Sequence, residues 1–381
     1  MRVAFFTEGY DPFTNGAIVL VKQYRQQLED LGHEVVVFAP EHPEFRDDDD
    51  HVVRLPSIAW SRQAYPSLRP FSGLGRQFDR WRFDLIHSHH PFSMGLAAER
   101  LARRSQIPLV HTFHTMLPDF ACYAPVARTL IGRALTSVVR RHCAHTRCVT
   151  VTNYLMRDWL VERGVRTPIA IVPPAVCLPR PEPGARWRIR AGLGVKGDTV
   201  VLLYVGRLAP EKNLDFLLRS VARLDRRRDW RLVLVGPGPE GPHLRDLSSL
   251  LGLADRVTLT GGVAHSAVQD YNSAGDISVL SSLSETFGLV ILEAMSVGLP
   301  CIAVGINGPL AVVENGTTGI LTLPDEQSFA AAVESLIRDR NLRQTMGRAS
   351  KNASLWYSTE RASARLIDAY RLALPPGMKL T

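Results

Sequence analysis

Glu285 and Glu293 lie eight positions apart in a segment that otherwise consists of apolar and small residues. Ser284 and Thr286 are typical N-cap residues, and an apolar run follows them. The pattern therefore predicts that Glu285 lies in the turn before a helix and that Glu293 lies about two turns inside it. Two carboxylates placed in this way can bind two different groups of one ligand.

The start of this predicted helix is a candidate anion site. The first backbone N–H groups of a helix have no partner within it, and the positive end of the helix dipole attracts negative charge. A carboxylate beside such a site suits a ligand that joins a sugar to a phosphate. Glu285 then binds sugar hydroxyls and Glu293 binds a ribose, while the amides of Gly288 and Leu289 bind phosphate. The spacing alone also fits an ordinary amphipathic helix with one exposed and one ion-paired glutamate.

Two other loops carry residues suited to a phosphate ligand. Arg207 and Lys212 lie five positions apart between an expected strand at 200–205 and an expected helix at 214–224. An arginine can bridge two oxygens of a diphosphate, and a lysine acts as a point charge. Gly236 follows the expected strand 231–235, and its missing side chain lets a ligand approach the backbone. Each loop taken alone is also common on protein surfaces.

A group of histidines falls within 28 residues of the chain: His87, His89, His90, His111 and His114. Such a group can bind a metal ion. However, His111 and His114 are expected to face opposite sides of one strand, which favours separately hydrogen-bonded histidines. The four acids at 47–50 are interpreted as a solvated loop. We therefore predict no bound metal.

Length and composition indicate a globular chain of two domains. The 381 residues are 45% hydrophobic and 22% charged, which is enough for two cores. The five cysteines form no C-x-x-C pair, so free thiols in a reducing compartment are expected. Residues 3–6 predict a first strand rather than a signal peptide. No apolar run is long enough for a membrane span.

Positive charge is concentrated in one part of the chain. The formal net charge is +8 and the pI is near 9.5, so an acidic partner is expected. Residues 60–147 contain 13 arginines and no lysine, against four acidic residues. Nucleic acid is one candidate partner. The chain has no recognition motif for it, and such a function leaves Glu285 and Glu293 unexplained.

Strands and helices alternate along the chain, which is typical of parallel, doubly wound sheets. Five prolines at 172–184 predict a stiff linker between two α/β domains. We expect domains at 1–174 and 178–357, with a C-terminal helical segment at 358–381 that completes the first. The predicted strands lie at 3–7, 35–39, 84–87 and 109–112 in the first domain, and at 200–205, 231–235, 257–259, 277–280 and 301–304 in the second.

The segment 284–295 resembles the E-x7-E motif of the retaining glycosyltransferases of family 4, including its Glu-Thr-Phe-Gly and Glu-Ala-Met. Gly298-Leu299-Pro300 is similar to the Gly-x-Pro that follows in that family. The loop from Gly206 to Lys212 resembles its G-R-x-x-x-x-K motif. The resemblance covers essentially the whole chain. It implies a GT-B fold, in which two Rossmann-like domains face each other across a cleft and the last helix returns to the first domain.

The resemblance also implies a set of site residues. The catalytic residues would be His114, Arg207, Lys212 and Glu285, with the two cations neutralising the departing UDP in place of a metal. No separate cofactor is implied. The residues implied to bind the nucleotide sugar are Gly16, Arg207, Lys212, Gly236, Val263, Glu285, Thr286, Phe287, Gly288, Leu289 and Glu293.

One branch of the family has the greatest similarity in motif. The sequence His111-Thr112-Phe113-His114-Thr115-Met116, with Asp119 after it, resembles the bacterial monoglucosyldiacylglycerol synthases and related glycolipid glycosyltransferases. The resemblance implies transfer of a hexose, with UDP-glucose favoured, to a lipid such as diacylglycerol. It places His114 beside the reacting carbon of the donor sugar. Phe120 stands where those enzymes tend to have an aromatic hydroxyl, which leaves open a soluble sugar or glycan as acceptor. A GT-B epimerase is a further alternative, but the acid and base carboxylates it needs are not located.

Residues 126–147 have the spacing of an amphipathic helix. Arg133, Arg140 and Arg147 recur every seven residues and are expected to form one basic stripe beside a broad apolar face. One interpretation is docking on an anionic membrane, which places the protein in the cytoplasm at the inner face of the cell membrane. The other is a core helix with a solvated basic face.

Overall fold

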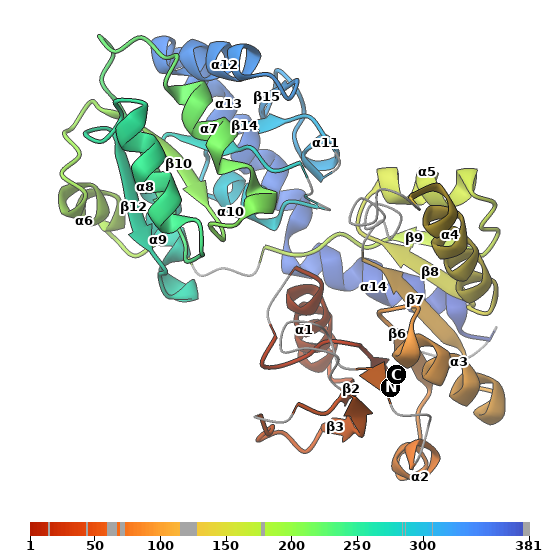
Figure 1. The fold of residues 1–381 in the computed structure, drawn as a ribbon. Helices are drawn as coiled ribbons and strands as arrows, with labels where there is room; N and C mark the ends of the chain where they lie inside the picture. Colours follow the sequence, from red (N-terminus) through yellow and green to blue (C-terminus); the bar gives the residue numbers. More distant parts are fainter. Residues whose placement is uncertain are drawn as a thin grey trace. The chain divides into compact units, whose positions relative to one another are not determined.

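The computed structural model divides into two compact units, shown in Figure 1. Unit 1 comprises Met1–Ala175 and Thr359–Thr381, and unit 2 comprises Val176–Ser358. The described residues are 1–13, 16–42, 45–58, 67–68, 73–114, 128–176, 180–283, 285, 287–306 and 308–375. The contact boundaries fall beside the predicted ones. The assignment of one unit to an acceptor and the other to a nucleotide sugar stays a prediction.

Unit 1 is built on a seven-stranded parallel sheet in the order β3-β2-β1-β6-β7-β8-β9. Its strands are β1 Arg2–Phe6, β2 Glu34–Pro40, β3 Val52–Leu55, β6 Leu85–Ser88, β7 Leu109–Phe113, β8 Cys148–Val151 and β9 Ile169–Ile171. A short antiparallel pair, β4 Ser57–Ile58 and β5 Ser67–Leu68, is separate from this sheet. The helices are α1 Gly16–Asp30, α2 Leu74–Phe78, α3 Ser93–Ser105, α4 Arg128–Ala144, α5 Tyr154–Glu162 and α14 Thr359–Ala373.

Alternation along each strand supplies both faces of this sheet with apolar side chains. Val3 and Phe5 of β1 belong to one buried cluster, which also includes residues of α1 and α14. Ala4 and Phe6 of the same strand belong to another, with residues of α3. A further cluster joins β7 and β8 to α4 and α5. The sheet is therefore covered on both sides, as a parallel sheet requires.

The last helix of the chain belongs to unit 1, although residues 176–358 separate it from the rest of that unit. Helix α14, the blue helix labelled in Figure 1, packs against α1 and β8. Tyr370 is completely buried, and its hydroxyl lies 2.8 Å from His87 Nδ1. Helix α14 lies within the predicted C-terminal segment 358–381, of which residues 376–381 lie outside the described part.

Unit 2 has a six-stranded parallel sheet in the order β12-β11-β10-β13-β14-β15. Its strands are β10 Val200–Val205, β11 Trp230–Val235, β12 Val257–Gly261, β13 Ile277–Leu280, β14 Cys301–Val304 and β15 Gly319–Thr322. The helices are α6 Ala185–Gly192, α7 Leu214–Val221, α8 Gly241–Leu250, α9 Val268–Ala274, α10 Leu289–Ser296, α11 Gly308–Val312, α12 Glu326–Arg338 and α13 Arg340–Ser354. Three short 3-10 turns, Pro210–Lys212, His265–Ala267 and Leu355–Tyr357, join them.

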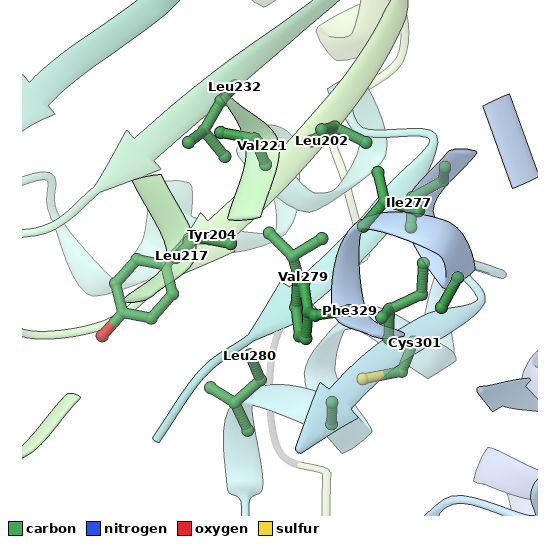
Figure 2. Packing of buried hydrophobic residues seen from close by; sticks show 14 of the residues in the cluster. Leu202, Tyr204, Leu217, Val221, Leu232, Ile277, Val279, Leu280, Cys301 and Phe329 are labelled. Carbon is green, nitrogen blue, oxygen red and sulfur yellow. The ribbon is translucent and has the colours of Figure 1, made fainter. Parts of the chain in front are cut away.

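Two buried clusters hold the strands of unit 2 against their helices, and the larger is drawn in Figure 2. Figure 2 shows Val279 of β13 in the middle of this cluster, with Leu202 of β10 and Leu217 of α7 around it. Phe329 of α12 and Cys301 of β14 belong to the same cluster. This core fixes the strand ends from which the candidate site residues project.

The predicted strands agree closely with the observed ones, and the main omissions are edge or short elements. Strands 200–205, 277–280 and 301–304 have the predicted bounds. The prediction missed β3, β8, β9 and β15, which have only three or four residues each. Such short runs carry little periodicity.

The prediction that Arg147 belongs to a basic stripe along one helix is wrong. Helix α4 stops at Ala144, because the chain turns where the Thr146 hydroxyl donates to the Cys143 carbonyl at 2.7 Å. Arg147 therefore lies beyond the helix. Val138, predicted on the apolar face, is 40% exposed, whereas Val139 is buried. The side chains of residues 126–135 lie outside the described part.

Candidate active site

Lys212 and Glu285 form an ion pair between two loops of unit 2. Lys212 ends the 3-10 turn after β10, and Glu285 lies in the loop after β13, so 73 positions of sequence separate them. Both strands end at the same edge of the sheet because they are parallel neighbours. Only 22% of the Lys212 side chain and 15% of the Glu285 side chain are exposed. The ion pair is thus partly shielded from water at the carboxyl edge of the sheet, where ligands bind in such folds.

Two serines after β13 fix the turn that carries Lys212. The Ser281 hydroxyl donates to the Lys212 carbonyl at 2.9 Å, and the Ser282 hydroxyl donates to the Glu211 carbonyl at 3.3 Å. Asn213 has a φ of 54° and begins α7. Its side-chain amide donates to the Ser281 carbonyl at 3.4 Å. The sequence motif alone gave no sign of these serines, which hold the lysine backbone in place.

Arg207 has a different environment from Lys212. Its side chain is 65% exposed and pairs with Glu211, four residues later. An exposed pair of this kind contributes under about 1 kcal/mol to stability. The Arg207 carbonyl accepts a hydrogen bond from the buried Tyr204 hydroxyl at 3.0 Å. The backbone of Arg207 is therefore fixed, while its guanidinium can leave Glu211 for an incoming anion.

Gly236 allows the loops after β10 and β11 to touch through their backbones. A Cβ at this position would lie 2.0 Å from the Gly206 carbonyl oxygen, and the φ of Gly236 is 142°. The Gly206 amide donates to the Val235 carbonyl, and the Gly236 amide donates to the Gly261 carbonyl. The packing of the protein's own backbone therefore requires glycine at this position. This reason is additional to the predicted close approach of a ligand.

The sequence predicts this helix at 288–297, and helix α10 is observed at Leu289–Ser296. Its N-cap is Gly288, with φ 80° and ψ 55°, and its first residue is Leu289. Glu293 therefore lies about one turn inside the helix, not two. Ser284 and Thr286, the expected N-cap residues, lie outside the described part.

A tertiary hydrogen bond fixes the backbone just before α10. The Glu285 carbonyl accepts from the Gly308 amide at 2.7 Å, so the backbone before the helix is used by a neighbouring segment. Phe287 is buried and contacts the Tyr357 ring edge to face at 5.9 Å. Its side chain belongs to the core, so only its backbone is available to a ligand. In the first turn of α10 the Ile291 amide donates to the Gly288 carbonyl at 2.9 Å. The binding of an anion by the amides of Gly288 and Leu289 stays a prediction.

Glu293 carries a carboxyl group without a hydrogen-bond partner among the described residues. Its carbonyl accepts from Gln269 Nε2 at 3.3 Å and from the Ser296 hydroxyl at 2.7 Å, but these contacts leave the side chain free. Burial raises the pKa of Glu293 to about 7. Glu293 is half-buried, and a carboxyl group with a raised pKa and no partner among the described residues is a candidate for binding a ligand.

The remaining predicted donor-site residues lie in two different units. Val263 follows β12 in unit 2 and packs partly against the core, with its backbone at the same strand edge. Gly16 begins α1 in unit 1, and a Cβ there would meet nothing within 4 Å. The protein itself therefore does not require glycine at residue 16. The structure brings together Lys212 and Glu285. Gly16 and His114 belong to the other unit.

The histidines of unit 1 form two separate groups on opposite faces of the sheet. His111 Nδ1 lies 2.9 Å from the Ser88 hydroxyl, which also lies 3.2 Å from His142 Nε2 of α4. His114 instead lies against His89. The expectation that His111 and His114 face opposite sides is confirmed.

Burial lowers the pKa values of these histidines. The value falls to about 3 for His87 and to about 4 for His90. The pKa values of His89, His111 and His114 also fall well below the ordinary value, chiefly through burial. All five are therefore uncharged at neutral pH.

Within the described ranges, only one group of three metal-ligand side chains has its ligand atoms within 4.8 Å of one another. It consists of Asp215, Glu240 and His243 on the first turns of α7 and α8, and excludes the predicted histidines. His243 Nε2 lies 2.9 Å from both Asp215 oxygens. Hydrogen bonding to Asp215 raises the pKa of His243, as expected for a surface ion pair. The absence of a catalytic metal stays a prediction.

The four acids at 47–50 are more than a solvated loop. Asp47 forms a double hydrogen bond with Arg54, at 2.6 and 2.9 Å. Asp49 pairs with Arg25 at 2.6 Å. Only 9% of the Asp47 side chain is exposed. These acids anchor the loop after β2, a role that a run of like charges does not reveal.

Two protein-family models match this chain, one for each half. The model described as "Glycosyltransferase Family 4" matches residues 14–180, and the model described as "Glycosyl transferases group 1" matches residues 185–353. The junction between the matches lies near the boundary of the two units.

Curated relatives include enzymes of two kinds. The alpha-monoglucosyldiacylglycerol synthase of Streptococcus pneumoniae is 29% identical, over 88% of this chain and 78% of the relative. The D-inositol 3-phosphate glycosyltransferase of Kineococcus radiotolerans is 34% identical, over 77% of this chain and 72% of the relative.

Solved structures with similar folds include the sucrose-phosphate synthase of Thermosynechococcus elongatus. Its TM-score is 0.79 at 23% identity, covering 97% of this chain and 98% of that one. Anabaena HepE, solved with UDP and glucose, has a TM-score of 0.75 at 21% identity, covering 97% and 99%. With the two parallel-sheet units, these similarities confirm the predicted GT-B fold.

We predict that Gly236→Ala destabilises the protein by about 2 kcal/mol or more, because its Cβ meets a backbone oxygen that cannot move alone. Gly241→Ala is the matched control. Residue 241 begins α8, and a Cβ there meets nothing within 4 Å. Urea denaturation of both variants gives the comparison. Equal midpoints for the two would contradict the steric argument.

Proposed function

The chain belongs to the family 4 glycosyltransferases, and from this premise we propose that it transfers a hexose from a UDP-sugar to a lipid acceptor with retention of configuration. Its belonging to the family makes it a glycosyltransferase. The observation that supports the donor assignment is the Lys212–Glu285 ion pair at the carboxyl edge of the sheet, together with Glu293 about one turn inside the helix that follows Glu285. A cation, a hydroxyl-binding carboxylate and a second carboxylate suit the diphosphate, hexose and ribose of one nucleotide sugar.

Each assigned residue has a distinct role in this proposal. Arg207 and Lys212 neutralise the charge that develops on the diphosphate as the glycosidic bond breaks, so no metal ion is needed. Glu285 binds hexose hydroxyls, Glu293 binds the ribose, and the amides at the start of α10 bind phosphate. His114 contacts the sugar near its reacting carbon. A UDP oxygen assists removal of the acceptor proton on the same face of the sugar.

UDP-glucose and a lipid such as diacylglycerol are the substrates we favour. The name of the pneumococcal relative supports both the glucose and the lipid, and UDP and glucose bound to HepE agree with the donor. The names of the Kineococcus relative and of the sucrose-phosphate synthase support a soluble acceptor instead. A soluble sugar or sugar phosphate is therefore the second candidate.

The decisive experiment incubates the purified protein with UDP-glucose, UDP-galactose or UDP-N-acetylglucosamine. Each reaction is run with diacylglycerol in vesicles, with soluble sugars and sugar phosphates, and with no acceptor, and products are identified by mass. We expect a hexosyl lipid from UDP-glucose, formed equally well in EDTA. Transfer only to a soluble acceptor would replace the lipid proposal, and a strict need for a divalent ion would overturn the role of the two cations.

We expect Lys212→Ala to weaken UDP binding by about 10- to 100-fold, the range for a charge-assisted hydrogen bond. Part of this loss comes from Glu285, whose carboxylate then faces the diphosphate without its cation. The double variant Lys212→Ala/Glu285→Gln should therefore regain some UDP affinity without regaining turnover. Calorimetry and initial rates measure both quantities.

The control for these variants is Arg219→Ala, which removes an exposed cation from α7. It should leave UDP affinity and turnover unchanged. If Glu285→Gln alone weakened UDP binding and spared turnover, Glu285 would not bind the hexose.

The affinity for UDP-glucose should rise by up to about tenfold between pH 6 and pH 8. Glu293 is protonated below its pKa of about 7, and the ionised form accepts stronger hydrogen bonds from ribose hydroxyls. Binding therefore favours the ionised form and releases a proton. UDP-glucose is suitable because its diphosphate does not titrate in this range. Glu293→Gln should give a flat profile, and a wild-type affinity that is flat or falls with pH would contradict the assignment.

Unit 1 carries a basic surface suited to an anionic membrane. Arg140, Arg141 and Arg147 are exposed and form no ion pair with any described residue. Leu96 of α3 and Val138 of α4 are exposed apolar residues on helices that contact each other. In the described part of the chain, no helix is long and apolar enough to cross a bilayer. On the basis of the exposed arginines, we propose that the protein docks peripherally, at the cytoplasmic face of the membrane.

Vesicles with phosphatidylglycerol should sediment the protein at low salt and release it at high salt, because each basic residue near an anionic surface contributes about 1 kcal/mol and salt screens it. Replacing Arg140, Arg141 and Arg147 by serine should reduce sedimentation without changing UDP affinity. The control replaces three exposed arginines of unit 2 by serine: Arg219, Arg228 and Arg245. This variant loses the same charge but should sediment as the wild type does. Wild-type protein that stays in solution at low salt would count against docking and for a soluble acceptor.

A further inference from the structure

His89 and His114 form a specific hydrogen-bonded pair within the histidines of unit 1. His89 follows β6 and His114 follows β7, two parallel neighbours whose register pairs Ser88 with His111. His89 Nδ1 lies 3.1 Å from His114 Nε2, and the ring centroids are 5.3 Å apart. His89 is 1% exposed and His114 is 8% exposed. The two rings are therefore fixed relative to each other by one hydrogen bond.

Only one of the two rings can donate this hydrogen bond. Burial holds the pKa values of both histidines well below the ordinary range, so both rings are neutral at pH 7. A neutral imidazole carries a single N–H, and its other nitrogen is an acceptor. Either His89 Nδ1–H donates to His114 Nε2, or His114 Nε2–H donates to His89 Nδ1.

The second nitrogen of His89 decides between these arrangements. His89 Nε2 is buried and has no hydrogen-bond partner among the described residues. Its ring packs against Phe5 at 4.7 Å and His87 at 4.2 Å between centroids. If His114 donated, the only proton of His89 would lie on Nε2 as a buried N–H without a partner. Buried N–H groups of that kind are rare, whereas the opposite arrangement uses the His89 proton in a hydrogen bond.

We propose that His89 is a positioning residue that donates from Nδ1 to His114 Nε2 and thereby holds His114 as the Nδ1–H tautomer. The proton on one ring nitrogen is set by the hydrogen bond that the other nitrogen makes. His114 Nδ1 makes no hydrogen bond to any described residue and is outside the set of buried orphaned nitrogens. It therefore presents an N–H donor to a ligand oxygen, such as a hydroxyl, a ring oxygen or a phosphate oxygen.

The effect of this tautomer on turnover rests on the proposed function, but the tautomer itself does not. Selective ¹⁵N labelling of histidine and two-bond ¹H–¹⁵N correlation spectra report which ring nitrogen carries the proton. The signals of His114 are assigned by their loss in His114→Asn. We expect a protonated Nδ1 and a bare Nε2 in the ligand-free protein at pH 7.

Two variants of nearly equal shape separate hydrogen bonding from packing. Asparagine at residue 89 keeps an N–H donor near the position of Nδ1, whereas leucine has a similar shape and no donor. His89→Leu should lose the fixed tautomer of His114 and lower kcat about tenfold, with little change in KM for the UDP-sugar. His89→Asn should retain both the tautomer and most of the turnover. Thermal melts of the two variants check that each is folded.

Each outcome of these measurements either supports or overturns the proposal. A His114 that carries its proton on Nε2 in the wild-type protein overturns the proposal, whatever the activity. Equal effects of His89→Asn and His89→Leu on tautomer and kcat would also overturn it, since packing alone would then explain them. If the expected tautomer is found but no sugar is transferred, the inference about His89 stands and the proposed function fails.

Discussion

At the carboxyl edge of the unit 2 sheet, two cations are each neutralised by a carboxylate of the protein itself. Lys212 is paired with Glu285, and Arg207 is paired with Glu211. Neither cation is therefore left unneutralised in the free protein. A diphosphate that enters this edge has to compete with two carboxylates. Because Lys212 is the more shielded of the two cations, its pairing has the larger influence on ligand affinity.

The backbone around this ion pair is built to keep it in one place. Ser281 and Ser282 hold the turn that carries Lys212, and Gly308 holds the carbonyl of Glu285. Gly236 lets a third loop approach to backbone contact. The charges of the site thus lie on loops whose positions are fixed by hydrogen bonds to a rigid sheet. Loops of this kind can carry function without being mobile.

Unit 1 differs from unit 2 in that its polar network consists of buried, uncharged groups instead of ion pairs. A chain of hydrogen bonds runs from Tyr370 through His87 to Thr112 and Thr150, with distances of 2.8, 2.6 and 2.5 Å. It joins the last helix of the chain to the middle of the sheet. Low dielectric strengthens such bonds and keeps the histidines neutral. The C-terminal helix is therefore an integral part of unit 1.

The sequence by itself determined the fold class, the main strands and the start of α10 to within a residue, because strand and helix periodicity are local features. It could not determine that the Gly308 amide binds the Glu285 carbonyl just before that helix. It also could not determine that Glu211 neutralises Arg207, that Asp47 is buried against Arg54, or that His89 faces His114. Those facts depend on which residues far apart in the chain meet and on which groups lose contact with water. Only the tertiary structure decides both, because burial and hydrogen-bond partners set the charge and the proton position of a side chain.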